Sequence, residues 1–331
     1  MILQPIRSVG VLGGGAWATA LAITAVRAGR SVKLWARSIS TVAAIKDRRE
    51  NPRYLPGVTL DAGIGATAHL AEVVGADALI LAVPAQSVRA VAGVVAKLAV
   101  PGTPLIIAAK GLERGNNKRL SQVVGEVAPR LVPAVLSGPG FAAEVARGLP
   151  TAVTVAAADE AVAATLALAL QNPAFRPYAE TDVIGVEIGG AVKNVLAIAA
   201  GIVTARRLGA GALAALVARG FAELRRLAEA LGGRPETLMG LSGLGDLVLT
   251  CSSPQSRNFS YGVVLGEGGT PDAGHPLAEG VYTAAAAQTL ARRFHVDMPI
   301  VDAVASVLGK EISVDRAIDS LMARPLKRET E

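Results

Sequence analysis

Lys193 lies in a stretch, Gly189 to Gly201, whose other residues are almost all small or apolar. On a helix, the positions that share its face are all glycine or alanine: Gly189, Gly190, Ala197, Ala200 and Gly201. Such a face lets a ligand or another backbone approach the ammonium closely. A lysine in apolar surroundings also tends to have a lowered pKa, which suits proton transfer. The alternative is a lysine whose stem lies against a tight helix contact while its charge reaches water.

A second group of chemically capable residues surrounds Asp246. Glycines stand on both sides of it, and a polar loop follows from Cys251 to Asn258. The loop ends in Ser256, Arg257 and Asn258, which offer two hydrogen-bonding side chains and one fork-shaped cation. This combination is suited to a phosphate group, although such a loop taken alone is more often only solvated.

A glycine-rich turn near the N-terminus has the pattern G-x-G-x-x-A at Gly13, Gly15 and Ala18. In a dinucleotide-binding turn the first glycine permits the tight bend, the second lets the backbone approach a pyrophosphate, and the third position needs a small residue for packing. The same region, Val9 to Val26, is free of charge and could instead be the core of a signal peptide. Three consecutive glycines weaken the helix that such a core needs, so we favour a strand, a turn and a helix.

Arg37 follows the strand expected after this turn. An acidic residue there would hold the ribose 2′-hydroxyl of NAD, but the sequence reads Trp35-Ala36-Arg37-Ser38. Arg37 can accommodate a 2′-phosphate, so we expect NADP(H) to be accepted. The alternative is an ordinary surface arginine.

The elements that must position these residues fall into two classes. Short apolar strands alternate with helical segments as far as about residue 180, which predicts an α/β fold with a parallel, doubly wound sheet. After Asp182 helical periodicity dominates. We therefore predict a dinucleotide-binding Rossmann domain over residues 1–185 and an all-α substrate-binding and catalytic domain over residues 186–331. The expected strands are Ile6–Leu12, Val32–Ala36, Asp77–Val83, Pro104–Ala109, Ala134–Gly138, Thr151–Ala157 and Ala174–Glu180, and the expected helices Ala16–Ala28, Gly189–Val203, Ala210–Leu231 and Val281–Arg293.

Composition narrows the class of partner. The 331 residues are 51% apolar and 18% charged, which disfavours disorder. The net charge of +6 is scattered in ones and twos, and aromatic residues make up only 3%, so a small phosphorylated substrate fits better than nucleic acid. Beyond the opening stretch, every charge-free run is too short to span a membrane. Cys251 is the single cysteine, and His69, His275 and His295 lack ligand spacing, so no metal site is predicted.

Read in order, the motifs resemble the bacterial type of NAD(P)-dependent glycerol-3-phosphate dehydrogenase over about residues 8 to 310. The motifs are "GGGAWATALA", "LILAVPAQ", "AAKGLE", "VLSGPGFAAEVARGLPTA", "GGAVKNVLAIAAGI", "GLSGLGDLVLTCSSPQSRN" and "LAEGVYTA". The resemblance implies a Rossmann domain followed by a helical domain like that of the 6-phosphogluconate dehydrogenase superfamily. It also implies reversible reduction of dihydroxyacetone phosphate to sn-glycerol 3-phosphate by NAD(P)H without a metal, in the cytoplasm, for phospholipid synthesis. A homodimer is compatible with it.

The resemblance also implies residue roles. Lys193 matches the general acid and base, and Lys110, Asn194 and Asp246 match residues that assist it. The cofactor contacts that it implies are Gly13, Gly15, Ala16, Trp17, Arg37, Lys110, Ala142, Arg257, Glu279 and Val281. The implied substrate contacts are Lys110, Gly138, Gly140, Lys193, Asp246, Ser256, Arg257 and Asn258.

Three positions depart from the family pattern. The family usually has serine where Ala16 and Gly140 stand, and asparagine where Gly211 stands. Each departure removes a polar group near the cofactor or the substrate. We expect them to alter affinity rather than the class of reaction, because the lysines, Asp246 and Arg257 remain.

Two other functions fit parts of the sequence. A reductase of 2- or 3-hydroxy acids from the same superfamily would keep the glycine turn and the lysine but would have less use for Ser256, Arg257 and Asn258. A non-catalytic protein that senses the cofactor is the binding alternative, and the presence of both Lys193 and Lys110 argues against it.

Overall fold

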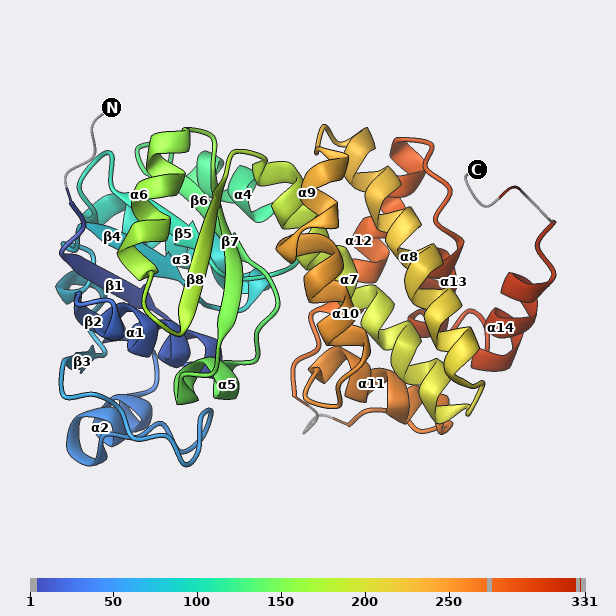
Figure 1. Ribbon diagram of the computed structural model, residues 1–331, viewed down its shortest axis with the longest axis horizontal. Helices are drawn as coiled ribbons and strands as arrows, with labels where there is room; N and C mark the ends of the chain where they lie inside the picture. The colour runs from blue at the N-terminus through green and yellow to red at the C-terminus, as the bar shows by residue number, and fades with distance from the viewer. Residues whose placement is uncertain (1–4, 273–275, 326–327, 329–331) are drawn as a thin grey trace.

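The computed structural model describes residues 5–272, 276–325 and 328; His275 lies outside them. A β-sheet with its flanking helices forms one half of the molecule, and a bundle of helices forms the other (Figure 1). The two halves meet along α7 (Val183–Ala205), which follows the last strand directly. The α/β class and the following all-helical region are as predicted from the sequence.

The sheet has eight strands in the order β3-β2-β1-β4-β5-β6-β7-β8. Neighbours from β3 to β6 are parallel, and the chain reverses the direction of winding between β1 and β4. This is the doubly wound arrangement, in which ligands bind at the carboxyl edge where the winding reverses. The strands are β1 Ser8–Leu12, β2 Ser31–Trp35, β3 Ile64–Thr67, β4 Ala78–Leu81, β5 Pro104–Ile107, β6 Val132–Ser137, β7 Thr151–Ala157 and β8 Phe175–Glu180.

One prediction about the sheet was wrong, because the sheet is mixed rather than parallel throughout. β7 pairs antiparallel with β6, and β8 is parallel to β7. The link between β6 and β7 holds only the short helix α5 (Ala142–Arg147), which lies at the carboxyl edge beside α1 (Figure 1). A parallel strand needs a crossover along the face of the sheet, and α5 does not provide one.

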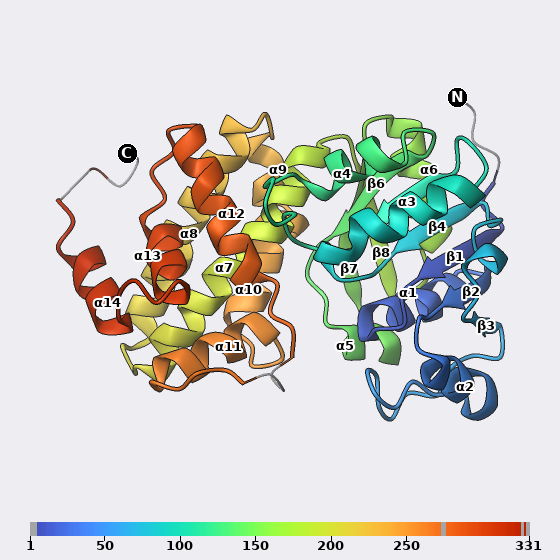
Figure 2. The same ribbon diagram turned by 180° about the vertical axis from the view of Figure 1, so that it is seen from behind.

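Helices cover both faces of the sheet. This is required because successive side chains of a strand point to opposite faces and both sets are apolar. In β4, Ala78 and Ile80 pack in the core shared with α1 and α6, whereas Leu79 and Leu81 pack in the core shared with α3 and α4. Figure 2 shows α3 and α4 on the face turned away from the viewer of Figure 1. The helices of this half are α1 Ala16–Arg27, α2 Ile39–Arg48, α3 Val88–Leu98, α4 Leu120–Val127, α5 and α6 Glu160–Leu170, with 3-10 turns η1 Leu70–Glu72 and η2 Ala85–Ser87.

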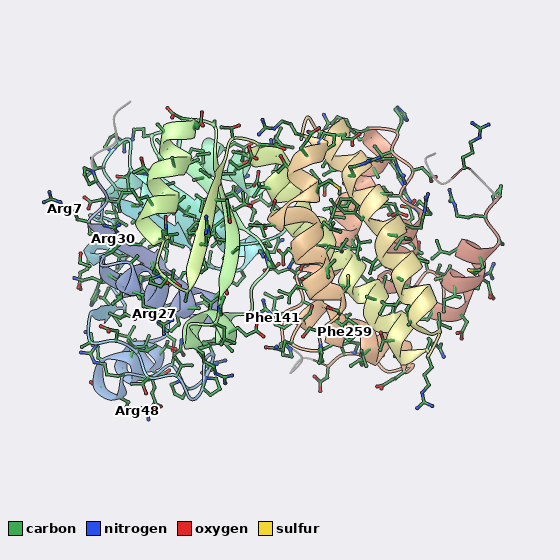
Figure 3. All side chains as sticks on the ribbon, viewed as in Figure 1. Arg7, Arg27, Arg30, Arg48, Phe141 and Phe259 are labelled. Atoms are coloured by element: carbon green, nitrogen blue, oxygen red, sulfur yellow. The ribbon has the colours of Figure 1, made fainter. Side chains whose placement is uncertain are left out.

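Two arginines join α1 to its neighbours. Arg27 donates to the carbonyl oxygens of Val145 (3.1 Å) and Ala146 (2.7 Å) in α5. Arg30 donates to the carbonyl oxygen of Ala169 (3.0 Å) in α6. Both arginines are labelled in Figure 3, near the C-terminal end of α1. The helix that follows the glycine turn is therefore held against the rest of this half at its far end.

The helical half is built around α7, which is buried along most of its length. α7 begins six residues before the predicted start at Gly189, because the Asp182 side chain caps it by accepting the Gly185 N–H (2.8 Å). The predicted division near residue 185 falls in the first turn of α7 and stays a prediction. The other helices are α8 Ala210–Ala230, α9 Pro235–Met239, π-helical η3 Leu241–Gly245, α10 Asp246–Cys251, α11 Arg257–Gly266, α12 Gly280–Arg293, α13 Pro299–Leu308 and α14 Val314–Met322.

By length and composition alone, α7 could cross a membrane. It passes this test although Glu187 and Lys193 interrupt its apolar run. However, 83% of its most apolar window is buried inside the protein. This burial is typical of a core helix, whose apolar side chains already have protein partners.

Candidate active site

The carboxyl ends of four parallel strands lie at one edge of the sheet, and one of these strands, β6, contacts α7. β1 leads into the glycine turn at Gly13, β4 into Pro84, β5 into Lys110 and β6 into Gly138. This is the edge at which a doubly wound sheet binds its ligands. Most of the site residues predicted from the sequence lie along this edge or on the helices that face it.

Lys193 and Lys110 share one buried carboxylate. The Lys110 Nζ is 2.6 Å from Oδ2 of Asp246, and the Lys193 Nζ donates a short hydrogen bond to the other carboxylate oxygen, Oδ1. The Asp246 side chain is 1% exposed, that of Lys193 is 7% exposed and that of Lys110 is 19% exposed. The two ammonium groups, 83 residues apart in the sequence, therefore converge on one anion.

Burial lowers the pKa of Lys193 to about 8. The Asp246 carboxylate opposes this shift, and the positive charge of Lys110 adds to it. A lysine with this pKa is partly protonated near neutral pH, so it can both donate and accept a proton. The prediction of a lowered pKa, made from the apolar face around Lys193, agrees with this arrangement.

Thr250 belongs to the same cluster, and sequence reasoning missed it. The Lys193 Nζ donates to the Thr250 Oγ1 (2.6 Å), and this hydroxyl donates to the backbone carbonyl oxygen of Asp246 (2.6 Å). Thr250 follows Asp246 by four residues, so both side chains lie on one face of α10. That spacing is the signal that could have found it. Thr250 and Asp246 together fix the position of the Lys193 ammonium.

The glycine turn has the geometry expected of a phosphate-binding turn. Gly13 has φ +137°, and a Cβ there would lie 2.4 Å from the Ala82 carbonyl oxygen, so only glycine fits. Apart from Gly15 itself and its two chain neighbours, no described atom lies within 4 Å of the place where a Cβ of Gly15 would stand. Gly15 leaves the first turn of α1 without a side-chain cap, and Ala16 adds only a methyl group. The first turn of α1 thus has no side-chain cap for its N–H groups, and the space beside Gly15 is open, as a phosphate site requires. Ala18 is fully buried, as its packing role requires.

The segment after β6 contributes backbone groups to the site. Gly138 is buried and has φ +144°, and its carbonyl oxygen accepts a hydrogen bond from Lys110 (3.0 Å). Gly140 lies beside the Trp17 ring, since a Cβ there would lie 3.5 Å from Cη2 of Trp17. Ala142 begins α5 and is half-buried. Trp17, Gly140 and Ala142 are therefore brought to the same edge as the glycine turn.

Asn194 and Asn258 make their hydrogen bonds to each other and to the backbone. Asn258 donates to the Asn194 side chain (2.9 Å) and accepts the Gly280 N–H (2.9 Å), and Asn194 donates to the Gly190 carbonyl oxygen (3.3 Å). Both side chains are buried. This series of hydrogen bonds joins α7, α11 and α12 beside Lys193. The two asparagines therefore also have a structural role, which was not predicted from the sequence.

Ser256 and Arg257 stand at the start of α11. The Ser256 hydroxyl caps the helix by accepting the Phe259 N–H (3.2 Å). Arg257 is exposed at the first helical position. A helix N-terminus next to an exposed guanidinium suits an anion.

Glu279 and Val281 face different surroundings, although the sequence analysis placed both at the cofactor. Glu279 accepts the Ala85 N–H (3.0 Å) just after β4. Burial raises the pKa of Glu279, and the Ala85 hydrogen bond and the charge of Arg257 oppose the shift. Val281 instead lines a groove with Arg114 and Tyr282. Its role as a cofactor contact stays a prediction.

Arg37 is exposed at the end of β2, beyond Trp35. Within the described part of the chain, no hydrogen bond or ion pair restrains its guanidinium. The site thus offers the parts that a dinucleotide needs: an open glycine turn, an uncapped helix end and a free cation near the second strand. Among the described residues no group of three or more histidine, cysteine or acidic side chains could hold a metal ion.

Comparisons with known proteins point to one family over nearly the whole chain. The family profile described as NAD-dependent glycerol-3-phosphate dehydrogenase N-terminus matches residues 8–163, and the profile for its C-terminus matches residues 182–319. A glycerol-3-phosphate dehydrogenase (NAD(P)+) from a Bradyrhizobium species is 57% identical over 323 residues, which are 98% of each chain.

A comparison with solved structures points to the same family. The crystal structure of glycerol-3-phosphate dehydrogenase from Coxiella burnetii has a TM-score of 0.91 at 36% identity and covers 97% of this chain and 100% of that one. A 3-hydroxyisobutyrate dehydrogenase from Salmonella typhimurium is similar in fold alone, at 19% identity and a TM-score of 0.54, covering 95% of this chain and 99% of that one.

Proposed function

The chain belongs to the NAD-dependent glycerol-3-phosphate dehydrogenase family, and on that premise we propose that it interconverts dihydroxyacetone phosphate and sn-glycerol 3-phosphate with Lys193 as general acid and base. It is an NAD(P)-dependent oxidoreductase. The observation that carries the role of Lys193 is the carboxylate of Asp246, which holds Lys193 and Lys110 together at the carboxyl edge beside the glycine turn.

Lys193 handles the proton of the reaction. When bound, the reduced nicotinamide supplies the hydride that attacks the carbonyl carbon of the substrate. The Lys193 ammonium gives a proton to the carbonyl oxygen and becomes neutral, so that a ketone, a hydride and a proton yield an alcohol. In the reverse direction the neutral Lys193 amine takes the hydroxyl proton. The pKa of about 8 serves both directions.

Lys110 supports this step as a second cation. Its ammonium lies on the other oxygen of Asp246 and is more exposed than that of Lys193, so it can reach a bound substrate. A positive charge near the substrate oxygen stabilises the negative charge that develops there as hydride arrives. Asp246 and Thr250 are positioning residues for the two lysines.

The substrate phosphate is assigned to the start of α11. Ser256 caps that helix, and Arg257 extends from it into solvent with no fixed partner among the described hydrogen bonds and ion pairs. Helix N–H groups and a guanidinium together recognise a phosphate through charge-assisted hydrogen bonds. The cofactor pyrophosphate is assigned to Gly13, Gly15 and the first turn of α1.

The finer statements rest on the family resemblance. These are a cytoplasmic place in phospholipid synthesis and a homodimeric state. Acceptance of NADPH rests instead on Arg37 after the second strand, and independence from metal ions rests on the lack of ligand spacing in the sequence. The domain roles proposed for residues 1–185 and 186–331 follow from the glycine turn in the first and Lys193 in the second.

Initial rates test the phosphate assignment. Purified enzyme is given NADH or NADPH with either dihydroxyacetone phosphate or dihydroxyacetone. We expect turnover with the phosphorylated ketone and little or none with the other, because only the former can contact Arg257. Equal rates would refute the phosphate assignment and favour a reductase of unphosphorylated substrates. No oxidation of either cofactor with any ketone would favour a protein that only binds the cofactor.

A further inference from the structure

The glycine turn is fixed by a side chain that comes from a distant part of the sequence. Asn51 follows α2 and is completely buried. Its Nδ2 donates to the Gly14 carbonyl oxygen (2.9 Å) and to the Thr19 Oγ1 (2.8 Å). The amide therefore connects the chain after α2 both to the turn and to the first turns of α1.

Thr19 continues this connection to the next peptide unit. Its hydroxyl donates to the Gly15 carbonyl oxygen (3.0 Å), and its own backbone N–H donates to the same oxygen (3.0 Å). Gly13 is held separately, because its N–H donates to the Trp35 carbonyl oxygen (2.9 Å) at the end of β2. Three consecutive residues of the turn are thus fixed by different partners.

Fixing these carbonyl oxygens also fixes the direction of the N–H groups that bind phosphate. In a trans peptide the C=O and N–H of one unit point in opposite directions. The Gly14 oxygen points to Asn51, so the Gly15 N–H points away from Asn51. The Gly15 oxygen points to Thr19, so the Ala16 N–H points out of the start of the helix. Apart from the chain neighbours of Gly15, no described atom lies within 4 Å of the place where its Cβ would stand, so the space beside the turn is open.

We propose that Asn51 is a positioning residue for the cofactor, which acts through Thr19 and Gly14 to hold the N–H groups of Gly15 and Ala16 toward the pyrophosphate. The inference rests on the proposed function only in taking the ligand to be a dinucleotide. Glycine has unusual backbone freedom, so a turn of three glycines needs such external restraints to stay in one conformation before it binds.

The chemistry of the Asn51 side chain supports this assignment. Its two hydrogen bonds both use the NH2 group, and its Oδ1 is buried with no partner among the described residues. An unpaired buried acceptor is costly. The burial of Asn51 is therefore accounted for by the hydrogen bonds of its NH2 group to Gly14 and Thr19, and not by its carbonyl oxygen.

The test compares amide-to-carboxylate changes at two asparagines that both contact α1. Asn51→Asp removes the NH2 group at the turn. Asn172→Asp removes the same group at the far end of α1, where the Asn172 Nδ2 donates to the Thr24 carbonyl oxygen (3.2 Å). Thr19→Val removes the hydroxyl without adding charge, which separates loss of the hydrogen bonds from repulsion of the phosphates. Thr19→Ser keeps the hydroxyl and is its conservative control.

Binding is measured on the full-length protein without substrate, by titration with NADH and separately with ADP-ribose, which has the pyrophosphate but no nicotinamide. For Asn51→Asp and Thr19→Val we expect the Kd of both ligands to rise about tenfold, the effect of losing one or two hydrogen bonds at the turn. For Asn172→Asp and Thr19→Ser we expect little change. At saturating NADH, kcat should stay within about twofold of wild type in all four variants, because the chemistry at Lys193 is untouched.

Three results would overturn the inference. One is an unchanged Kd in folded Asn51→Asp and Thr19→Val. Another is an equal loss of affinity in Asn172→Asp, which would reduce the effect to general stability. The third is weaker binding of NADH with unchanged binding of ADP-ribose, which would place the effect at the nicotinamide. If Asn51→Asp does not fold, Thr19→Val against Thr19→Ser decides the matter. A wild type that binds NADH but reduces no ketone would refute the proposed function and leave this inference standing.

Discussion

At the scale of single residues, the site depends on one carboxylate that serves two lysines. Burial lowers the pKa of Lys193, and the positive charge of Lys110 acts in the same direction. The Asp246 carboxylate opposes both effects and keeps the pKa of Lys193 at about 8. This pKa suits the role proposed for Lys193, which is to release a proton near neutral pH and take it back in the reverse reaction.

The first prediction concerns pH and Lys193. In the proposed mechanism, reduction of dihydroxyacetone phosphate needs protonated Lys193, so its kcat should fall as the pH rises through about 8. Oxidation of glycerol 3-phosphate needs the neutral amine, so its kcat should rise through the same pH. Initial rates in both directions from about pH 6 to about pH 10 measure this fall and this rise.

Lys193→Ala should lose most of kcat, roughly a hundredfold or more, while it still binds NADH. Near-normal turnover in that variant would exclude the role.

The second prediction concerns the choice of cofactor. Arg37 is exposed, and a 2′-phosphate would give it a charged partner that NADH lacks. Arg37→Ala should raise the KM for NADPH about tenfold and change the KM for NADH little. Initial rates with each reduced cofactor measure this. An equal loss with both cofactors would mean that Arg37 does not contact the 2′-phosphate.

Sequence reasoning found the residues whose type is informative and missed those whose contacts are distant. Lys193 was identifiable because its small neighbours recur at helical spacing. Asn51 was not, because its partners Gly14 and Thr19 lie more than 30 residues earlier and only the fold brings them together. Asn194 and Asn258 were identified, but their bond to each other joins residues 64 apart, so no local pattern records it.

At the scale of elements, α7 meets α11 through glycines. A Cβ on Gly201 would lie 2.1 Å from the Phe259 carbonyl oxygen, and one on Gly262 would lie 2.0 Å from that of Ile198. Phe259 is labelled in Figure 3 at α11. The two helices therefore pack backbone against backbone, which brings Ser256 and Arg257 at the start of α11 close to the helix that carries Lys193.

The third prediction tests this packing. Gly201→Ala should destabilise the protein by about 1–3 kcal/mol or more, because the added methyl group meets backbone that cannot move aside. Gly211→Ala is the matched control, since Gly211 lies in α8 with no atom near its missing Cβ. That change should stabilise the protein by about 0.4–1 kcal/mol. Urea unfolding followed by circular dichroism measures both, and similar effects of the two substitutions would contradict the close contact.

The elements themselves were largely predictable, but their relations were less so. Each predicted strand is present within a few residues, because buried parallel strands are short and apolar. The antiparallel direction of β7 was not predictable from its composition, since it depends on where α5 lies. The early start of α7 depends on the Asp182 cap, which lies before the recurring glycines on which the predicted start was based.

At the scale of the whole molecule, polar contacts join the two halves around the site. Besides the bond from Lys110 to Asp246, Arg119 at the start of α4 pairs with Glu187 of α7 (2.7 Å). The Ala85 N–H after β4 is bonded to Glu279 beside α12. Each contact links a segment that follows a strand's carboxyl end to a helix of the other half. The halves are therefore held in register at the candidate active site.

The last prediction concerns a buried acid in the helical half. Glu223 of α8 is 2% exposed and accepts the N–H groups of Ile300 (2.8 Å) and Val301 (3.1 Å), in the first turn of α13. Burial raises the pKa of Glu223 from 4.5 to about 7, although these two bonds and the charge of Arg226 oppose the shift. Between those values the folded protein binds more protons than the unfolded chain, so its stability should fall as the pH rises through that window.

Glu223→Gln removes this titration but keeps an acceptor for α13. The difference in the free energy of unfolding between variant and wild type should therefore shift in favour of the variant, by up to about 3 kcal/mol between pH 4.5 and about pH 8. Lys193 does not interfere, because its pKa of about 8 places its linkage at higher pH. Urea unfolding of both proteins at several pH values gives the difference. Parallel pH curves would show that Glu223 stays ionised in the fold, held by α13 more strongly than burial opposes it.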